Sequence, residues 1–270
     1  MLPSAKHPHS ADSALFCLQQ TWRRLTLLTI VGLLAGFGGL AAARELEFAT
    51  RWLGLAALTA GYSLAFLKRN LGRNRAAAAA PLHADLGPAT LVTLLRGILL
   101  AAVCGFLLSA RPPGGLAWIP AILFTAAMVL DILDGVLARR SGRQTELGRS
   151  FDLAHDRLGV LIGSALAVWY RVLPWPFLSI GLAGYLFEFG RWARRRAGRE
   201  IRELPLRFSR RPMAGVMMGF LSAVLWPIVG PPATTLAGVL ILVPFMAGFV
   251  RDWQAVSGRL DRASMRKPEG

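Results

Sequence analysis

Apolar runs of near-transmembrane length, separated by short polar or basic segments, constrain this chain more than any other feature. An α-helix needs about 20 residues to cross the hydrocarbon of a bilayer. The chain is 54% hydrophobic and only 17% charged, which is more apolar than an ordinary soluble domain. We therefore predict an all-α, polytopic membrane protein with about eight transmembrane helices. The runs are Leu25–Ala43, Trp52–Leu67, Leu91–Ser109, Trp118–Leu137, Leu158–Tyr170, Val172–Gly190, Met213–Val229 and Leu236–Val250.

The basic residues lie mainly in alternate connections between these runs. A net charge of +16 can indicate nucleic-acid binding, but that requires a folded basic face. Here 26 of the 31 Lys and Arg lie on one side of the predicted topology and only 4 on the other. The positive-inside rule then predicts a multi-pass protein of the cell (inner) membrane with both termini in the cytoplasm. We therefore expect the lipid bilayer, and not nucleic acid, as its partner. An alternative is a cleaved signal peptide ending near Ala41–Ala43, after Arg23 and Arg24.

A linker between the second and third runs divides the predicted protein. Residues 68–90 contain a basic cluster, the low-complexity stretch Ala76–Ala80, Pro81 and Gly87-Pro88. We predict a two-helix membrane extension with its linker over residues 1–90, a six-helix core over 91–250 and a basic cytoplasmic tail over 251–270.

Four aspartates gather within 26 residues, at Asp131, Asp134, Asp152 and Asp156. Spacings of three and four residues place each pair on one helix face, offset by about 60° and 40°. A hairpin turn between the pairs would bring all four to similar depth in the membrane. One such charge costs roughly 2.5–3.5 kcal/mol at a helix centre, so compensation is needed. Protonation of the carboxylates is one compensation, and binding of divalent cations is another, since oxygen-rich sites select Mg²⁺ or Mn²⁺. The alternatives are ion pairs with nearby arginines (Arg139, Arg140 or Arg157) or a water-filled vestibule.

Small residues and an arginine accompany the aspartates. Gly135 and Ala138 would let a ligand approach the helix, although small residues also serve helix packing. Arg139 suits a phosphate, although it also fits the positive-inside pattern. Together these residues indicate a site for a metal-bound, polyanionic ligand.

The full pattern, D-x2-D-G-x2-A-R-x8-G-x3-D-x3-D from Asp131 to Asp156, resembles the signature of the CDP-alcohol phosphotransferase family. The spans from Leu91 to Val250 resemble its six-helix core. The resemblance implies metal ligands for a two-metal Mg²⁺ or Mn²⁺ site at Asp131, Asp134, Asp152 and Asp156, with Asp156 also the general base. It implies nucleotide contacts at Gly135, Ala138, Arg139, Gly148 and Asp131.

The family also tends to carry an N-x2-T-x2-R segment in its first core helix. Thr93 and Arg96 match this segment as candidate core-helix contacts, whereas Thr90 stands in place of the Asn. This departure affects one polar contact.

The resemblance implies transfer of a substituted phosphate from a CDP-linked donor to a hydroxyl acceptor, with release of CMP, in phospholipid biosynthesis. CDP-diacylglycerol is the favoured donor; the alternative is a soluble CDP-alcohol with diacylglycerol as acceptor. A homodimer is also implied. Alternatives from other classes are a divalent-cation transporter and an inactive membrane scaffold.

Three further features bear on the acceptor and the site. The segment Arg191–Arg211 holds nine arginines, which suit either an acceptor phosphate, with Arg207, Arg210 and Arg211 as candidates, or anionic lipid headgroups. Glu188 is expected to pair with Arg191 at i+3. His155 is expected to support a motif carboxylate indirectly or to face another helix, rather than to bind metal.

Overall fold

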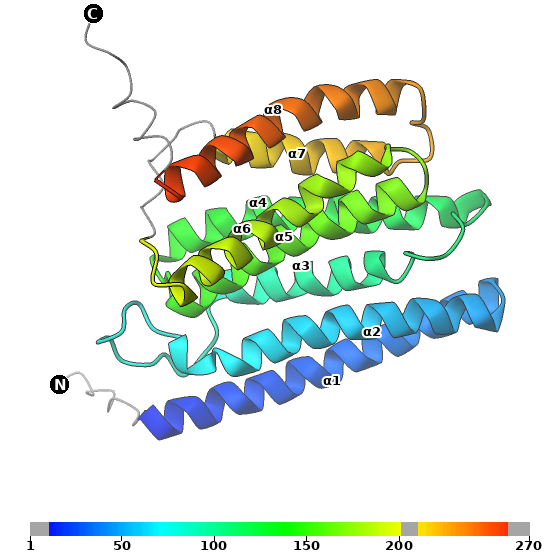
Figure 1. Cartoon of the computed structure of the whole chain (residues 1–270). Helices are drawn as coiled ribbons and strands as arrows, with labels where there is room; N and C mark the ends of the chain where they lie inside the picture. Colours follow the sequence, from blue (N-terminus) through cyan, green and yellow to red (C-terminus); the bar gives the residue numbers. More distant parts are fainter. Residues whose placement is uncertain (1–10, 201–209, 259–270) are drawn as a thin grey trace, which may run out of the picture. The chain divides into compact units, whose positions relative to one another are not determined.

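The computed structural model describes residues 11–200 and 210–258, and every regular element within them is a helix (Figure 1). The eight α-helices confirm the predicted all-α fold. They are α1 (Ala11–Ala43), α2 (Leu46–Arg69), α3 (Pro88–Cys104), α4 (Ile119–Ser141), α5 (Glu146–Trp169), α6 (Leu178–Arg196), α7 (Arg210–Val224) and α8 (Ala233–Val256), with 3₁₀ turns η1 (Leu71–Arg73), η2 (Gly114–Trp118) and η3 (Trp175–Phe177).

Several of these helices have the dimensions of membrane spans. Among the described residues, α1, the segment Gly114–Arg140 that contains α4, and α8 are long and apolar enough to cross a bilayer. Two shorter apolar stretches, Pro88–Cys104 and Gly215–Val224, accompany them. Large apolar side chains on α1, such as Leu27 and Leu28, are exposed, as expected of a surface that faces lipid. The protein is therefore a polytopic membrane protein.

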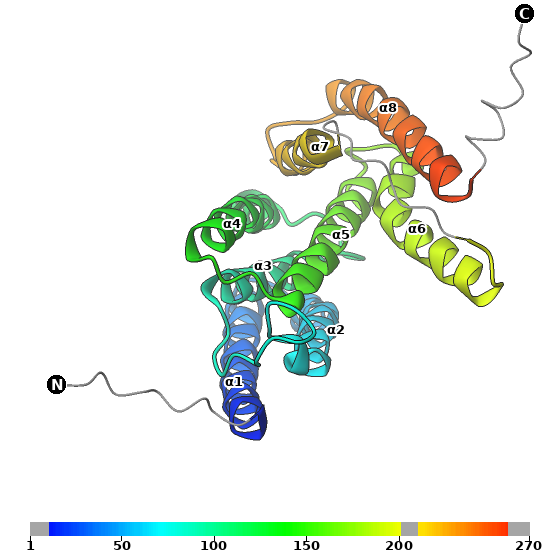
Figure 2. The same ribbon diagram turned by 90° about the vertical axis from the view of Figure 1, so that its left-hand side faces the viewer.

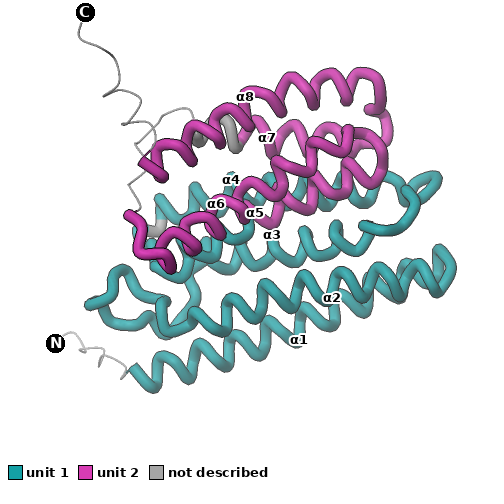
Figure 3. Tube along the Cα trace, in the orientation of Figure 1, with its two compact units in different colours: residues 1–156 teal, residues 157–270 magenta. Residues whose placement is uncertain are grey.

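The chain forms two compact units whose boundary falls inside α5 (Figure 3). Residues 1–156 form unit 1, in which α1 packs on α2, α2 on α3, and α3 on α4 (Figure 2). Residues 157–270 form unit 2, in which α6 and α7 each pack on α8.

The turn between α4 and α5 determines where the motif residues lie. Gly142 ends α4 in the left-handed conformation at φ 62°, which glycine adopts without steric cost. Just before α5, the Thr145 hydroxyl accepts a hydrogen bond of 3.0 Å from the Gly148 N–H. This satisfies one of the free donors at the start of α5. The result is the tight helical hairpin that the sequence predicted for residues 131–156.

The segment between α2 and α3 is folded onto unit 1. Asn74 is fully buried, and its amide donates to the backbone carbonyls of His83 and Asp85 at 3.1 and 2.9 Å. Its neighbours join an apolar cluster that reaches from α1 to α5. The buried members are Leu18, Leu64, Leu67, Leu71, Leu86, Leu94, Leu147 and Phe151. The predicted domain boundary at residue 90 remains a prediction, but the segment before it packs against the motif hairpin.

Candidate active site

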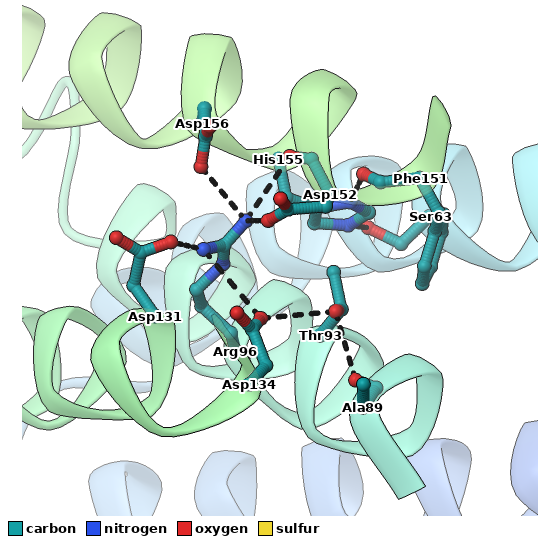
Figure 4. A network of polar contacts seen from close by, with 10 residues as sticks. All are labelled: Ser63, Ala89, Thr93, Arg96, Asp131, Asp134, Phe151, Asp152, His155 and Asp156. Atoms are coloured by element: carbon teal, nitrogen blue, oxygen red, sulfur yellow. Dashed lines mark hydrogen bonds and ion pairs between the residues drawn. The ribbon is translucent and has the colours of Figure 1, made fainter. Parts of the chain in front are cut away.

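The four motif aspartates meet around the guanidinium of Arg96 (Figure 4). Helix α4 carries Asp131 and Asp134, α5 carries Asp152 and Asp156, and α3 carries Arg96. Nη1 of Arg96 contacts the Asp131 carboxylate and lies 3.7 Å from Oδ2 of Asp134. Nη2 lies 3.0 Å from Oδ1 of Asp152 and 3.1 Å from Oδ1 of Asp156. The structure thus brings together all four carboxylates that the sequence singled out.

Part of the site is buried, and three of its carboxylates are exposed. Arg96 is 1% exposed and Asp134 is buried. The side chains of Asp131, Asp152 and Asp156 are 33%, 45% and 46% exposed. One carboxylate oxygen from each of these three lies within 4.8 Å of the others, an arrangement able to hold a metal ion. These three carboxylates are therefore accessible to a ligand.

A hydroxyl group on α3 contacts the carboxylate of Asp134. The Thr93 hydroxyl lies 3.0 Å from Oδ2 of Asp134 and 2.9 Å from the Ala89 carbonyl. One hydroxyl proton serves these two acceptors. Thr93 and Arg96, the two residues that match the predicted core-helix segment, thus both reach the motif carboxylates.

The remaining motif residues border the hairpin. A methyl group placed on Gly135 would lie 3.4 Å from Nη1 of Arg139, so the arginine folds back over this glycine. A methyl group on Gly148 would lie 3.2 Å from the Thr145 hydroxyl and 3.3 Å from that of Thr90. Thr90, which stands in place of the family's Asn, is therefore a buried neighbour of a motif glycine. Ala138 follows one turn after Asp134 and is partly exposed.

The central position of Arg96 was not predicted. Our sequence alternative paired the carboxylates with Arg139, Arg140 or Arg157, whereas the ion pairs shown by the structure use Arg96. A signal was present, because a lone charge in the apolar run Leu91–Ser109 needs a partner within the membrane.

Glu188 has the partner expected of it. It pairs with Arg191 at 3.3 Å, and it also pairs with Arg157 at 2.9 Å.

The candidate acceptor arginines are not placed by the structure. Arg207 lies outside the described residues. Arg210 and Arg211 begin α7, but their side chains are also outside what the structure describes. Their role stays a prediction.

An all-helical membrane fold with a carboxylate cluster on a helical hairpin fits the class of integral-membrane transferases that act on nucleotide-linked substrates. Comparison with protein families gives a match over residues 87–250 to CDP-alcohol phosphatidyltransferase. The match covers more than half of the 270 residues, and the chain belongs to this family. Neither the curated proteins nor the solved structures give a significant match. The protein is therefore a membrane-embedded transferase of CDP-alcohol substrates, as the sequence pattern predicted.

Proposed function

We propose that this protein transfers a phosphatidyl group from CDP-diacylglycerol to a hydroxyl acceptor and releases CMP. The observation that carries the proposal is the meeting of four carboxylates around Arg96, on the hairpin that lies inside the family match. The charge pattern of the loops supports a cytoplasmic site in the cell (inner) membrane, where CDP-linked donors are available.

The carboxylates fit a divalent cation. Their ligand atoms are all hard oxygens, which favour Mg²⁺ or Mn²⁺ over softer metals. Four ionised aspartates around one arginine leave an excess of negative charge. The cluster thus requires more positive charge than the protein supplies. A bound cation would neutralise the donor pyrophosphate and stabilise charge that develops during transfer.

The residues of the chain account for the remaining steps. Asp156, partly exposed, takes the proton of the acceptor hydroxyl as its oxygen attacks the phosphorus that carries the diacylglycerol. A new P–O bond forms to the acceptor, and the P–O bond to CMP breaks, with CMP leaving on the former bridging oxygen. Arg139, which folds back over Gly135, is proposed to bind phosphate, and Ala138 and Gly148 are proposed as nucleotide contacts from their motif positions. Arg96 holds the carboxylates of α4 and α5 together.

The acceptor is proposed to carry a phosphate of its own. Nine arginines in Arg191–Arg211 support this, and Arg210 and Arg211 directly begin α7. Replacing Arg207, Arg210 or Arg211 by Ala should then raise the acceptor KM by about 10- to 150-fold, because a charge-assisted hydrogen bond is worth about 1.5–3 kcal/mol. The donor KM should change little. Equal, small effects from all nine arginines would instead indicate contacts to lipid headgroups.

The proposed activity is tested by measuring CMP release from purified full-length protein in mixed micelles. CDP-diacylglycerol is paired in turn with serine, glycerol 3-phosphate, inositol and inositol phosphate. The alternative pairing is CDP-choline with diacylglycerol. Asp12→Asn, on the first turn of α1, is the matched control for Asp156→Asn. CMP release with CDP-diacylglycerol that Asp156→Asn loses and Asp12→Asn keeps supports the proposal; release only from CDP-choline contradicts the donor assignment.

A further inference from the structure

His155 lies between two motif aspartates, but its ring points to another helix (Figure 4). The ring is fully buried, and Nδ1 lies 2.8 Å from the Phe151 carbonyl. A carbonyl can only accept, so Nδ1 carries the proton. Nε2 lies 2.9 Å from the Ser63 hydroxyl on α2. In the neutral ring Nε2 is an acceptor, so Ser63 donates to it. The other acceptor near that hydroxyl, the Thr59 carbonyl, is farther away at 3.3 Å.

A glycine on α3 makes this bond possible. A methyl group on Gly97 would lie 2.5 Å from Nε2 of His155 and 3.1 Å from the Ser63 hydroxyl. Neither neighbour can move aside easily, because both are fully buried. Because Gly97 has no side chain, Ser63 of α2 and His155 of α5 can contact each other beside α3.

Two further contacts join α2 and the segment after it to the start of α5. The rings of Phe66 and Phe151 lie 5.7 Å apart between centroids. The N–H of Glu146 donates to the Arg75 carbonyl at 2.9 Å. All these residues belong to unit 1. The first turns of α5 are thus held by the N-terminal part of the chain as well as by Arg96.

We infer that His155 is a positioning residue, and that its bond to Ser63 makes the N-terminal helices part of the active-site framework. His155 follows Asp152 by three residues and precedes Asp156 by one. Any rotation of α5 that frees the ring also moves both carboxylates away from Arg96. The inference assigns the α1–α2 hairpin a role: it fixes the rotation of the helix that carries half of the carboxylates. It rests on the proposed function, and concerns only where the carboxylates lie.

The test compares two serine-to-alanine substitutions in the full-length protein. Ser63→Ala removes the hydroxyl that reaches His155. Ser164→Ala removes an equally buried hydroxyl on α5 that, among the described residues, bonds to the Val160 carbonyl of its own helix. The readouts are the Kd for Mn²⁺, measured by electron paramagnetic resonance without substrate, and kcat for CMP release.

Ser63→Ala should weaken Mn²⁺ binding by about 10- to 100-fold, the usual cost of losing a residue that orients metal ligands, and should lower kcat in parallel. Ser164→Ala should stay within about twofold on both. If Ser63→Ala does not fold, Ser63→Cys is the second variant: its thiol is larger and only a weak donor, so its Kd for Mn²⁺ should exceed that of the wild type.

Equal changes in Ser63→Ala and Ser164→Ala would overturn the inference, since the bond would then be structural only. An unchanged Kd in Ser63→Cys and Ser63→Ala would do the same, as would turnover by wild-type protein without any Mn²⁺ binding. Wild-type protein that binds Mn²⁺ but releases no CMP contradicts the proposed function instead, and the comparison of Mn²⁺ affinities still decides the role of His155.

Discussion

The two halves of α5 use their polar side chains in different ways. In residues 146–156, Asp152 and Asp156 contact Arg96 on α3, and His155 contacts Ser63 on α2. Beyond Arg157, the fully buried Ser164 bonds to the backbone of its own helix at 2.6 Å.

The second half begins with one ion pair to another helix, Arg157 with Glu188 on α6, and packs by close approach beyond it. A methyl group on Gly181 of α6 would lie 3.1 Å from the Leu161 Cα atom and 3.2 Å from the Ser164 Cβ atom. Small residues at such contacts are typical of helix packing in membranes. The comparison teaches that, among the described residues, several polar bonds between helices hold the carboxylates of the first half in place, whereas the second half uses one ion pair, Arg157–Glu188, and otherwise packs by fit.

The largest expected effect is that of removing divalent cations. Because the proposed metal ligands of α5 all lie in its first half, this tests the role of that half alone. Exhaustive chelation with EDTA should reduce CMP release to background, because the carboxylate cluster then lacks the charge that balances it. Addition of Mg²⁺ or Mn²⁺ should restore the rate. Undiminished CMP release after chelation would contradict the metal assignment. The folded fraction, followed by circular dichroism, controls for unfolding.

The second effect separates the carboxylates by role. Asp156→Asn should lower kcat by about 10²- to 10⁴-fold, the usual cost of removing a general base, and should retain part of the Mn²⁺ affinity. Asp131→Asn, Asp134→Asn and Asp152→Asn should weaken Mn²⁺ binding together with activity. Near wild-type turnover by Asp156→Asn would place the base elsewhere.

The third effect compares one glycine from each region. Gly97→Ala and Gly181→Ala both add a methyl group to a tight contact, and each should destabilise the fold by about 1–3 kcal/mol. Only Gly97→Ala displaces His155, so it should also lower kcat by about 10-fold or more. Thermal unfolding and CMP release measured on the same preparations check this. Equal kcat in the two variants would remove the distinction between the halves of α5.

The sequence predicted those features that depend on residues close together in the chain. Hydropathy predicted the helices, and the spacing of the aspartates predicted that the hairpin would bring them together. Helix α1 begins at Ala11 rather than near Leu25, because its first turns are too polar for an apolar run to reveal.

The interhelical contacts were beyond that reasoning. Arg96 bonds to Asp152 and Asp156 across 56 and 60 residues, and His155 bonds to Ser63 across 92. No periodicity encodes such pairs. Asn74 lies within the segment predicted as a linker, and its buried amide organises that segment before α3.

The smallest expected effect concerns the contact between this segment and the turn before α5. The Arg143 guanidinium donates two hydrogen bonds of 2.9 Å to the carboxylate of Asp85, and these bonds lower the pKa of Asp85 below its usual value of 3.8.

A lowered pKa means that the pair stabilises the fold fully above the unfolded-state pKa, near 3.8, and loses this contribution as the pH falls through the lower folded-state value. Both side chains are exposed to solvent, so the contribution should be no more than about 1 kcal/mol and should fade with salt.

Arg143→Ala should therefore lower the Tm slightly at pH 7 and at pH 5, by the same amount. The difference from wild type should shrink only below about pH 4. Because the pair lies outside the carboxylate cluster, kcat at pH 7 should stay within about twofold. A large loss of kcat in Arg143→Ala would show that the first half of α5 is positioned from its N-terminal turn as well as through His155.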